Sequence, residues 1–564
     1  MTKPTTLTGA ESAVKMLQAH GVKHIFGLCG DTSLPFYDAL ARLKHGMTHI
    51  LTRDERSASY MADGYARASG RVGVCEGPSG GGATYIIPGV AEANESSVPL
   101  LCITSDISVS SRGRFTLTEL DQEALFRPIT KWTQVVPRAS RVPLAFAEAF
   151  RRIGSGRPGA AHIGLPLDVQ RETLDASALP APAARAPRAA PDAQLVREAA
   201  ALLTRARQPA FVVGGGVMIA DACRELQTLA ERLGALACTT VSGKGSLAET
   251  HALCAGVVGS NGGTLPTRAV IDRADVVVFV GCRAGSVTTE KWRHPQPGAV
   301  KVIHIDVDPL VFGANYTTDV AMQADAKLAL AALIDELGAP RATWRARGQR
   351  AAVIVAAAKK EKFNIFNKLV LTRTRPITPE RIVAELRAVL DDEATVVADA
   401  GTPCPYFSAY YELRQAGRRF ISNRAHGALG YAMAAAAGVH FARPNQRTVA
   451  VMGDGSFGFT SGEMETLTRL NVPLLMVVVN NSSYGWIKAG QKTGFDKRYY
   501  SVDFTRTDHA KVAAAYGVKS WSVSDPTKLR AALQAAARHG GPALVDVIAQ
   551  PLQEANAPVS EWIV

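Results

Sequence analysis

Two short polar motifs in the C-terminal third of the chain each follow an apolar run, and together they could bind a metal ion and a phosphate. Gly453-Asp454-Gly455 comes directly after residues 448–452, and Asn480-Asn481 follows residues 474–479. The intervening stretch suits a helix, so a right-handed crossover would place both motifs at one edge of a parallel sheet. Carboxylate and amide oxygens are the hard ligands that Mg²⁺ prefers, and glycines let a phosphate approach the backbone. The spacing therefore predicts a Mg²⁺ and phosphate site.

This pair of motifs resembles the fingerprint of thiamine diphosphate-dependent enzymes. The resemblance covers the whole chain, whose order and length match the three-domain layout of the acetolactate synthase and benzaldehyde lyase branch. It implies that Mg²⁺ is held against the diphosphate by Asp454, Asn481 and the main-chain oxygen of Ser483. It further implies that the cofactor lies against Gly453, Gly455 and Ser456.

The chemistry of this family needs a carbanion at C2 of the thiazolium ring. The aminopyrimidine of the cofactor removes the C2 proton once a carboxylate hydrogen-bonds its ring nitrogen. Residues 52–67 resemble the "HE…ADGYAR" segment that carries this carboxylate in the family, with Asp54 where a histidine is usual. The resemblance therefore implies that Glu55 activates the cofactor.

Two further segments resemble parts of the family that shape the cofactor. Leu429 matches the bulky aliphatic residue that bends it, and the main-chain oxygen of the neighbouring Gly427 would hold the pyrimidine amino group. Residues 79–84 resemble a glycine loop of benzaldehyde lyase, in which Gly81 would lie close to the pyrimidine and the substrate. A tight turn without a ligand is the alternative interpretation of this loop.

The reaction itself stays open between three alternatives. Residues 27–31 resemble a decarboxylase segment with a catalytic aspartate, which makes Asp31 a candidate proton relay. The His-His pair of decarboxylases has no counterpart, however, and Ile487 stands where their acid follows the Asn-Asn motif. An apolar residue there favours attack on a second carbonyl compound. We therefore predict carboligation after decarboxylation of a 2-oxo acid, with an acyloin or 2-hydroxyacyl-CoA lyase or a simple 2-oxo acid decarboxylase as alternatives.

Substrate contacts are harder to assign. His426 occupies a position that is leucine in several relatives, so it either faces the substrate or is a core histidine. Gln122 ends a Glu-Leu-Asp-Gln segment that resembles one in oxalyl-CoA decarboxylase and 2-hydroxyacyl-CoA lyase. Its side chain either contacts the substrate or forms a hydrogen bond at a domain interface. Leu117-Thr118 stands where acetolactate synthases have Phe-Gln, which argues against pyruvate-specific chemistry.

Alternation of short apolar runs with helical stretches throughout the chain indicates parallel sheets covered by helices on both faces. We predict an α/β protein with three doubly wound parallel-sheet domains. By resemblance these are a pyrimidine-binding, a central Rossmann-like and a diphosphate-binding domain. The predicted divisions are 1–175 (pyrimidine-binding), 176–193 (linker), 194–340 (central), 341–375 (basic linker) and 376–564 (diphosphate-binding with a C-terminal lid).

In the central domain, Gly214-Gly215-Gly216 and Gly281-Cys282-Arg283 follow predicted strands, as a nucleotide site would require. The resemblance implies FAD or ADP at this place, although glycines after strands also occur without any ligand.

Composition excludes several classes of protein. The net charge is +13, and the segment from Arg341 to Arg375 contains ten basic residues and one acid. This segment is either a solvated linker with a helical portion or a surface that attracts an anion. No nucleic-acid motif accompanies this charge, and no apolar run is long enough to cross a membrane. Residues 1–5 show no apolar signal region, and the eight cysteines form no CxxC pair. We expect a cytoplasmic enzyme with reduced thiols, acting on small carbonyl substrates without nucleic acid or membrane.

In the relatives, the activating glutamate and the metal ligands of one cofactor come from different subunits. The resemblance therefore implies a homo-oligomer, with a dimer as the minimum and a tetramer as the expected assembly. Residues 551–564 are predicted to form a lid, with Trp562 as an apolar plug.

Overall fold

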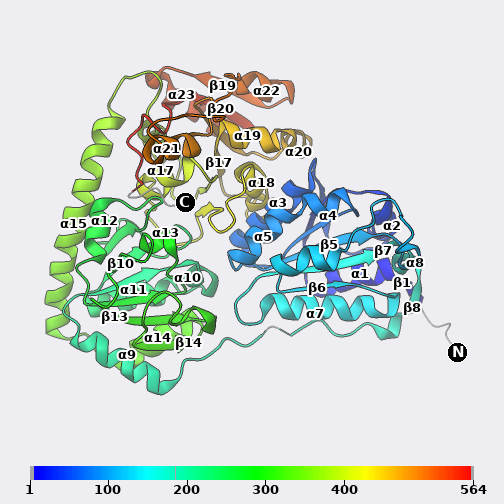
Figure 1. The fold of residues 1–564 in the computed structure, drawn as a ribbon, viewed down its shortest axis with the longest axis horizontal. Coiled ribbons are helices and arrows are strands. Elements are labelled where there is room, and N and C mark those ends of the chain that lie inside the picture. Colours follow the sequence, from blue (N-terminus) through cyan, green and yellow to red (C-terminus); the bar gives the residue numbers. More distant parts are fainter. Residues whose placement is uncertain (1–5, 185, 560–564) are drawn as a thin grey trace. The chain divides into compact units, whose positions relative to one another are not determined.

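Three six-stranded parallel sheets, each with helices on both faces, form the framework of the chain (Figure 1). The computed structural model describes residues 6–184 and 186–559. The predicted class, three doubly wound α/β domains, is confirmed.

The first sheet has the order β3-β2-β4-β5-β7-β6. Its strands are β2 (His24–Gly27), β3 (Thr48–Leu51), β4 (Gly73–Gly77), β5 (Leu100–Asp106), β6 (Trp132–Val135) and β7 (Ala160–Pro166). Its helices are α1 (Gly9–Ala19), α2 (Leu34–Arg42), α3 (Glu55–Ser69), α4 (Gly81–Tyr85), α5 (Ile87–Glu95), α6 (Gln122–Phe126), α7 (Val142–Gly154) and α8 (Leu167–Arg171). The strands β1 (Thr6–Thr8) and β8 (Thr173–Asp175) form a separate antiparallel pair. Helices α1 and α7 pack together on one face of the sheet, and α3 and α5 pack together on the other (Figure 1).

The second sheet has the order β11-β10-β9-β12-β13-β14. Its strands are β9 (Pro209–Val213), β10 (Leu236–Thr239), β11 (Cys254–Val257), β12 (Val276–Val280), β13 (Lys301–Asp306) and β14 (Val320–Gln323). The helices around it are α9 (Ala193–Arg205), α10 (Gly215–Ala220), α11 (Cys223–Leu233), α12 (Leu265–Ile271), α13 (Ser286–Thr289) and α14 (Ala326–Leu337). Its strands are almost continuously apolar because both faces are covered.

The third sheet has the order β16-β15-β17-β18-β20-β19. Its strands are β15 (Thr395–Ala398), β16 (Phe420–Ser422), β17 (Thr448–Gly453), β18 (Leu475–Asn480), β19 (Lys519–Val523) and β20 (Ala543–Ile548). The helices of this part are α16 (Pro379–Val389), α17 (Pro403–Tyr410), α18 (Tyr431–Ala442), α19 (Asp454–Thr460), α20 (Met464–Arg469), α21 (Gly485–Gly494), α22 (His509–Ala515) and α23 (Pro526–Arg538).

The strand orders locate the natural ligand-binding edges. Counted along the chain, the first and third sheets share the order 2-1-3-4-6-5, whereas the second has 3-2-1-4-5-6. In open α/β sheets, ligands bind beyond the carboxyl ends of the strands, where the chain changes direction across the sheet. That point lies between β2 and β4 in the first sheet and between β15 and β17 in the third. The loops after these four strands are therefore where a site is expected.

The chain divides into two compact units. One contains Met1–Pro187, Asn423–Thr448 and Ser456–Leu474, and the other contains Arg188–Ser422, Val449–Gly455 and Leu475–Val564. In the first unit, helices α3 and α18 pack closely because glycines stand at their contacts. A Cβ atom at Gly64 would lie 2.1 Å from the main-chain oxygen of Ala435, and one at Gly438 would lie 1.9 Å from that of Met61. The loop before α18 also reaches α3, because the Tyr60 hydroxyl donates to the main-chain oxygen of Leu429.

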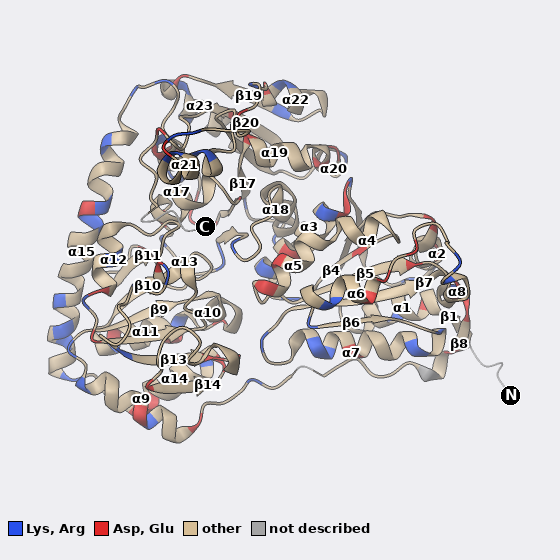
Figure 2. Ribbon diagram, viewed as in Figure 1, with Lys and Arg blue, Asp and Glu red and all other residues tan. Residues whose placement is uncertain are grey.

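Most of the basic segment 341–375 is one helix, α15 (Ala342–Val370), in the second unit. Trp344, Val355 and Phe366 on one side of it are buried in the hydrophobic cores. Two of its basic residues are buried as well: Arg347 donates to the main-chain oxygen of Leu233 and Lys362 to that of Ala409. Arg345, Arg350, Lys360 and Lys368 are exposed, whereas Lys359 is half-buried and donates to the main-chain oxygen of Glu249. Figure 2 marks the basic residues along α15 in blue. The segment is thus partly core and partly a charged surface.

The remaining segments concern the predicted linkers and lid. In the predicted first linker, residues 179–184 and 186–192 contain no helix or strand. In the predicted lid, residues 551–559 are irregular but partly buried, and the main-chain oxygen of Pro558 accepts a hydrogen bond from Gly262 N. Trp562 lies outside the described residues, as do residues 1–5. None of the described helices is both long and apolar enough to cross a membrane. The domain boundaries stay a prediction.

Candidate cofactor site in two halves

Asp454 begins α19 directly after β17, and backbone N–H groups surround its carboxylate. Oδ1 accepts from Gly455 N at 2.9 Å, and Oδ2 accepts from Asn481 N at 2.9 Å and from Ser482 N. The β17–β18 pairing that the sequence predicted therefore brings the two motifs together. The Asp454 residue is only 4% exposed, and burial raises the pKa of its carboxyl to about 6.

The two asparagines at the end of β18 form different hydrogen bonds. Asn480 is buried, and its amide nitrogen donates to Asp546 at 3.0 Å and to the main-chain oxygen of Thr507 at 3.0 Å. The amide oxygen of Asn481 accepts from both the main-chain nitrogen and the hydroxyl of Ser483, each at 3.2 Å. Asn480 therefore fixes the strand end, whereas Asn481 bonds to Ser483 through its amide oxygen and to Asp454 through its backbone N–H.

These donors fit a hard divalent cation. Asp454 is a buried carboxylate that forms no ion pair with a Lys or Arg among the residues that the structure describes, so a cation would offset its desolvation. The described residues include no group of three or more His, Cys, Asp or Glu able to hold a metal. One carboxylate, one amide oxygen and the Ser483 main-chain oxygen would leave coordination positions for phosphate and water, as Mg²⁺ requires. Asn481 Oδ1 would exchange at least one of its two hydrogen bonds from Ser483 for the cation. Ser483 O already accepts from Gly485 N at 2.9 Å, which leaves it one lone pair.

Two glycines leave room beside this carboxylate. A Cβ atom at Gly453 would meet nothing within 4 Å, and the same holds for Gly401, whose φ is +93°. Gly401 follows β15 at the direction change of the third sheet, so both glycines open the backbone at the expected ligand edge. Sequence reasoning missed Gly401, although a glycine after a strand was the available signal. Gly455 instead lies against Tyr484, whose ring a Cβ atom would approach to 2.8 Å.

Ile487 and its surroundings form an apolar border in the same unit. The Ile487 residue is 55% exposed on α21, and Tyr484 and Phe504 stack edge to face at 5.3 Å between ring centroids. Backbone hydrogen bonds from Tyr484 N to Val502 O and from Phe504 N to Ser482 O fasten this border to the Asp454–Asn481 turn. The apolar character predicted at position 487 is thus presented to solvent or ligand rather than to the core.

Glu55 is the first residue of α3, which follows β3, and its side chain reaches Gly77 at the end of β4. Asp54 caps this helix, since its carboxylate accepts from Arg56 N at 2.7 Å and from the Arg56 side chain at 2.8 Å. Asp54 therefore has a structural use at the position where the family has histidine. Glu55 is buried, and desolvation raises the pKa of its carboxyl, with a smaller contribution from the nearby charges of Asp54 and Glu76.

The glycine loop approaches Glu55 closely. A Cβ atom at Gly82 would lie 3.1 Å from Glu55 Oε1, and one at Gly77 would lie 3.2 Å from its Cγ. Gly80 has a φ of +63°, and Gly81 has only the Tyr85 ring edge, 3.9 Å away, beside its Cβ position. The loop therefore packs on the glutamate on one side and is open at Gly81 on the other, as a pyrimidine cradle would require.

The loop from Asn423 to Gly430, between β16 and α18, lies in the same unit as Glu55. Gly427 has a φ of +74° and open space at its Cβ position. The Tyr60 hydroxyl of α3 donates to the main-chain oxygen of Leu429 at 3.4 Å, and the Ser456 hydroxyl accepts from Gly430 N at 2.7 Å. Within one chain, α3, which begins at Glu55, therefore contacts the loop that carries Leu429.

Three predicted contacts have different environments. The His426 side chain is exposed. Asp31 is also exposed, in a single 3₁₀ turn after β2, next to Thr32, whose hydroxyl bonds to that of Ser105 at 2.7 Å. Gln122 is 1% exposed, accepts from the Thr104 hydroxyl at 2.5 Å and donates to Ser105 O at 2.9 Å. Its amide is thus engaged inside the first unit.

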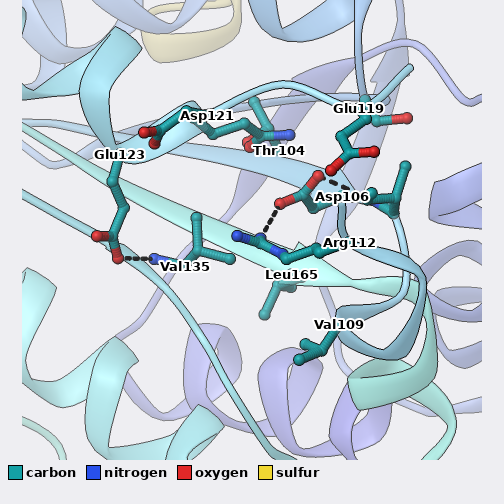
Figure 3. Close-up of polar contacts among 12 residues, drawn as sticks. Thr104, Asp106, Val109, Arg112, Glu119, Asp121, Glu123, Val135 and Leu165 are labelled. Carbon is teal, nitrogen blue, oxygen red and sulfur yellow. Dashed lines mark hydrogen bonds and ion pairs between the residues drawn. The ribbon is translucent and has the colours of Figure 1, made fainter. Parts of the chain in front are cut away.

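Figure 3 shows polar contacts of the loop after β5. Arg112 pairs with the buried Asp106 at 2.5 Å, and burial raises the pKa of that carboxyl to about 6. Glu119 accepts from Gly113 N at 2.6 Å, and Glu123 accepts from Val135 N at 2.9 Å. These acids order the loop, so they are engaged in structure rather than presented as a cation site.

The central glycines serve close packing. A Cβ atom at Gly214 would lie 2.1 Å from Gly281 O, and one at Gly216 would lie 2.5 Å from Gly281 Cα. Two loops thus touch at the direction change of the second sheet, which explains the glycines without a nucleotide. FAD or ADP at this place stays a prediction.

Comparison with known proteins places these observations in a family. Residues 7–125 match the N-terminal TPP binding domain of thiamine pyrophosphate enzymes, residues 196–333 their central domain and residues 399–547 their C-terminal TPP binding domain. A probable acetolactate synthase large subunit of Methanococcus aeolicus is 34% identical over 562 residues, covering 97% of this chain and 92% of that protein. The large subunit of acetolactate synthase isozyme 1 of Escherichia coli (strain K12) is 30% identical over 542 residues, covering 96% and 93%. The chain therefore belongs to the thiamine pyrophosphate enzyme family, in its acetolactate synthase-like branch.

Proposed function

We propose that this protein is a thiamine diphosphate- and Mg²⁺-dependent carboligase, which joins a 2-oxo acid, after decarboxylation, to a second carbonyl compound. The observation that carries the proposal is the buried Glu55 carboxyl at the start of α3, which forms no ion pair with a Lys or Arg among the described residues. A carboxyl kept out of water with a raised pKa is suited to hold a proton against a ring nitrogen.

Each residue has a stated task in this proposal. The bound cofactor supplies a nucleophilic carbon that adds to the carbonyl group of the substrate. Glu55 holds a proton between its carboxyl oxygen and the pyrimidine ring nitrogen, and the main-chain oxygen of Gly427 accepts a hydrogen bond from the pyrimidine amino group. Leu429 sets the bend of the cofactor. Asp454 and Asn481 bind the Mg²⁺ that holds the diphosphate.

Ile487 favours ligation over simple decarboxylation. Its side chain cannot deliver a proton, and it is exposed on α21, the helix that follows Asn481 in the chain. We assign Asp31 and His426 as substrate contacts because both side chains are exposed. Gln122 is buried, and its amide donates to the main-chain oxygen of Ser105, whose hydroxyl bonds to that of Thr32 next to Asp31.

The assembly and location are part of the same proposal. We propose a homotetramer built from dimers that share their cofactor sites, working in the cytoplasm. All eight cysteines are free thiols in the structure, seven of them not exposed, which suits a reducing compartment.

The test is pyruvate consumption by the purified protein with thiamine diphosphate and Mg²⁺, followed by mass spectrometry of all products, with and without benzaldehyde as acceptor. Acetolactate or a mixed 2-hydroxy ketone is the expected product. Free acetaldehyde alone would identify a simple decarboxylase. Cleavage of a supplied acyloin or 2-hydroxyacyl-CoA, without pyruvate consumption, would identify a lyase and refute carboligation from pyruvate.

A further inference from the structure

A buried cluster of charges lies beneath the loop that carries Gly427 and Leu429. Glu92 of α5 is 1% exposed, and its Oε1 accepts from Arg67 at 3.0 Å and from the Ser96 hydroxyl at 2.7 Å. Arg67 also donates to the fully buried Asp63 at 2.7 Å, and the Tyr431 hydroxyl at the start of α18 donates to the same carboxylate. Two carboxylates thus share one guanidinium in the contact between α3, α5 and α18.

The second oxygen of Glu92 faces the loop. Three successive backbone N–H groups converge on the carboxylate: His426 N lies 2.7 Å from Oε2, Gly427 N lies 3.4 Å from Oε2, and Ala425 N lies 3.4 Å from Oε1. Successive N–H groups that point to one side form a concave anion site, and here the anion is a side chain of the protein itself. The left-handed backbone at Gly427 is part of this turn.

The ends of the loop are held separately. The Asn423 amide donates to Ala428 O at 2.6 Å, and Gly430 bonds through its N–H to Ser456 and through its oxygen to the Thr460 hydroxyl at 3.1 Å. Between these anchors, the contact with Glu92 is what orients the peptide groups of residues 425–427. The N–H of Gly427 points to Glu92. The other side of Gly427, where a Cβ atom would meet nothing within 4 Å, therefore stays open to a ligand.

We propose that Glu92 is a positioning residue of the cofactor site: its carboxylate fixes the 425–427 turn, and thereby sets the Gly427 carbonyl and the Leu429 side chain against the aminopyrimidine. This inference rests on the proposed function and adds to it a residue that touches neither cofactor nor substrate. The buried charge is stabilised because Arg67 and the N–H groups together surround both oxygens. A neutral amide at this place would turn an N–H donor toward either Arg67 or the turn.

The test is the Glu92→Gln variant with Glu95→Gln as the matched control, since Glu95 is the exposed glutamate on the same helix. Three quantities are measured per folded molecule: kcat, the half-saturating concentration of thiamine diphosphate, and the near-ultraviolet circular dichroism of the bound aminopyrimidine. We expect Glu92→Gln to lower kcat by roughly a hundredfold, the scale of a 1 Å misplacement, and to change the dichroism of the bound cofactor. Glu95→Gln is expected to match the wild type.

A second variant, Glu92→Asp, keeps the inference testable if Glu92→Gln does not fold. Glu92→Asp keeps the charge beside Arg67 but withdraws it from the turn, so it is expected to fold, to bind cofactor and to show the same spectroscopic change with a smaller loss of kcat. Wild-type dichroism and kcat within twofold of wild type in the folded variants would assign Glu92 to stability alone and overturn the inference. A wild-type protein without any cofactor-dependent signal or turnover would instead refute the proposed function, and the inference with it.

Discussion

Replacing Asp454 by Asn separates the role of this residue in metal binding from its role in folding. In the ligand-free protein, the pKa of Asp454 lies at about 6 against an ordinary value of 3.8, because burial disfavours the charge. A folded-state pKa above the unfolded value gives stability that is present at low pH and lost as the pH rises through 6. At pH 8 the ionised carboxylate therefore costs the ligand-free fold about 3 kcal/mol.

The substitution removes this cost and introduces another. The amide has one oxygen for the three N–H groups of Gly455, Asn481 and Ser482, so at least one of them faces an NH₂ group. An unmatched buried donor costs about 1–3 kcal/mol. The two effects oppose each other, and we expect ligand-free Asp454→Asn to differ in stability from the wild type by less than about 2 kcal/mol at pH 8. At pH 5, where the wild-type carboxyl is largely protonated, the variant should be the less stable protein.

The ligand-bound proteins should differ far more. Mg²⁺ and thiamine diphosphate at a hundred times the dissociation constant stabilise a fold by about 2.7 kcal/mol, and Asp454→Asn removes the only charged side chain among the proposed metal ligands. Thermal unfolding with and without both ligands, at pH 5 and pH 8, measures this directly. The exposed Asp496, which pairs with the exposed Arg498, provides the control Asp496→Asn. An undiminished Mg²⁺-dependent shift in Asp454→Asn would refute the assignment of the metal site.

Three further predictions concern other parts of the site. Burial raises the pKa of Glu463, whose carboxylate accepts from Arg53 N, to about 7. The free energy of unfolding should therefore fall as the pH rises from about 4.5 to 7, and denaturation curves of Glu463→Gln should show a smaller fall. Gly427→Ala should cost about 1 kcal/mol of stability, because of its positive φ, yet weaken thiamine diphosphate binding at least about tenfold in calorimetry; unchanged affinity would exclude this turn from the site. Co-expressed Glu55→Gln and Asp454→Asn chains should recover about a quarter of the wild-type activity if subunits share the cofactor; no recovery would contradict a shared site.

The strand ends were predictable because their signals are local. A short apolar run followed by Gly-Asp-Gly or Asn-Asn marks the carboxyl end of a buried strand, and the β17–β18 pairing then brings Asp454 to Asn481. Glu55 was likewise implied by the resemblance of residues 52–67, whereas the start of α3 at this residue and its Asp54 cap come from the structure.

The supporting residues were not predictable, since their partners are distant in the chain and are mostly backbone groups. Glu92 holds N–H groups more than 330 positions away, and Glu463 holds Arg53 N across 410 positions. Nothing near either glutamate in the sequence distinguishes it from an exposed helical acid. The buried face of α15 was also hidden, because Arg347 and Lys362 are charged residues whose carbonyl partners come from elsewhere in the fold.

The central claim is that Glu55 activates bound thiamine diphosphate, and it can be tested without knowing the substrate. The measurement is hydrogen–deuterium exchange at C2 of the bound cofactor, stopped by acid and read by NMR, in the wild type and in Glu55→Gln at saturating Mg²⁺. Loss of a positioned proton-transfer group should slow the exchange by roughly 10²–10⁴-fold in the variant. Equal exchange rates in the two proteins, with the cofactor bound in both, would contradict the account.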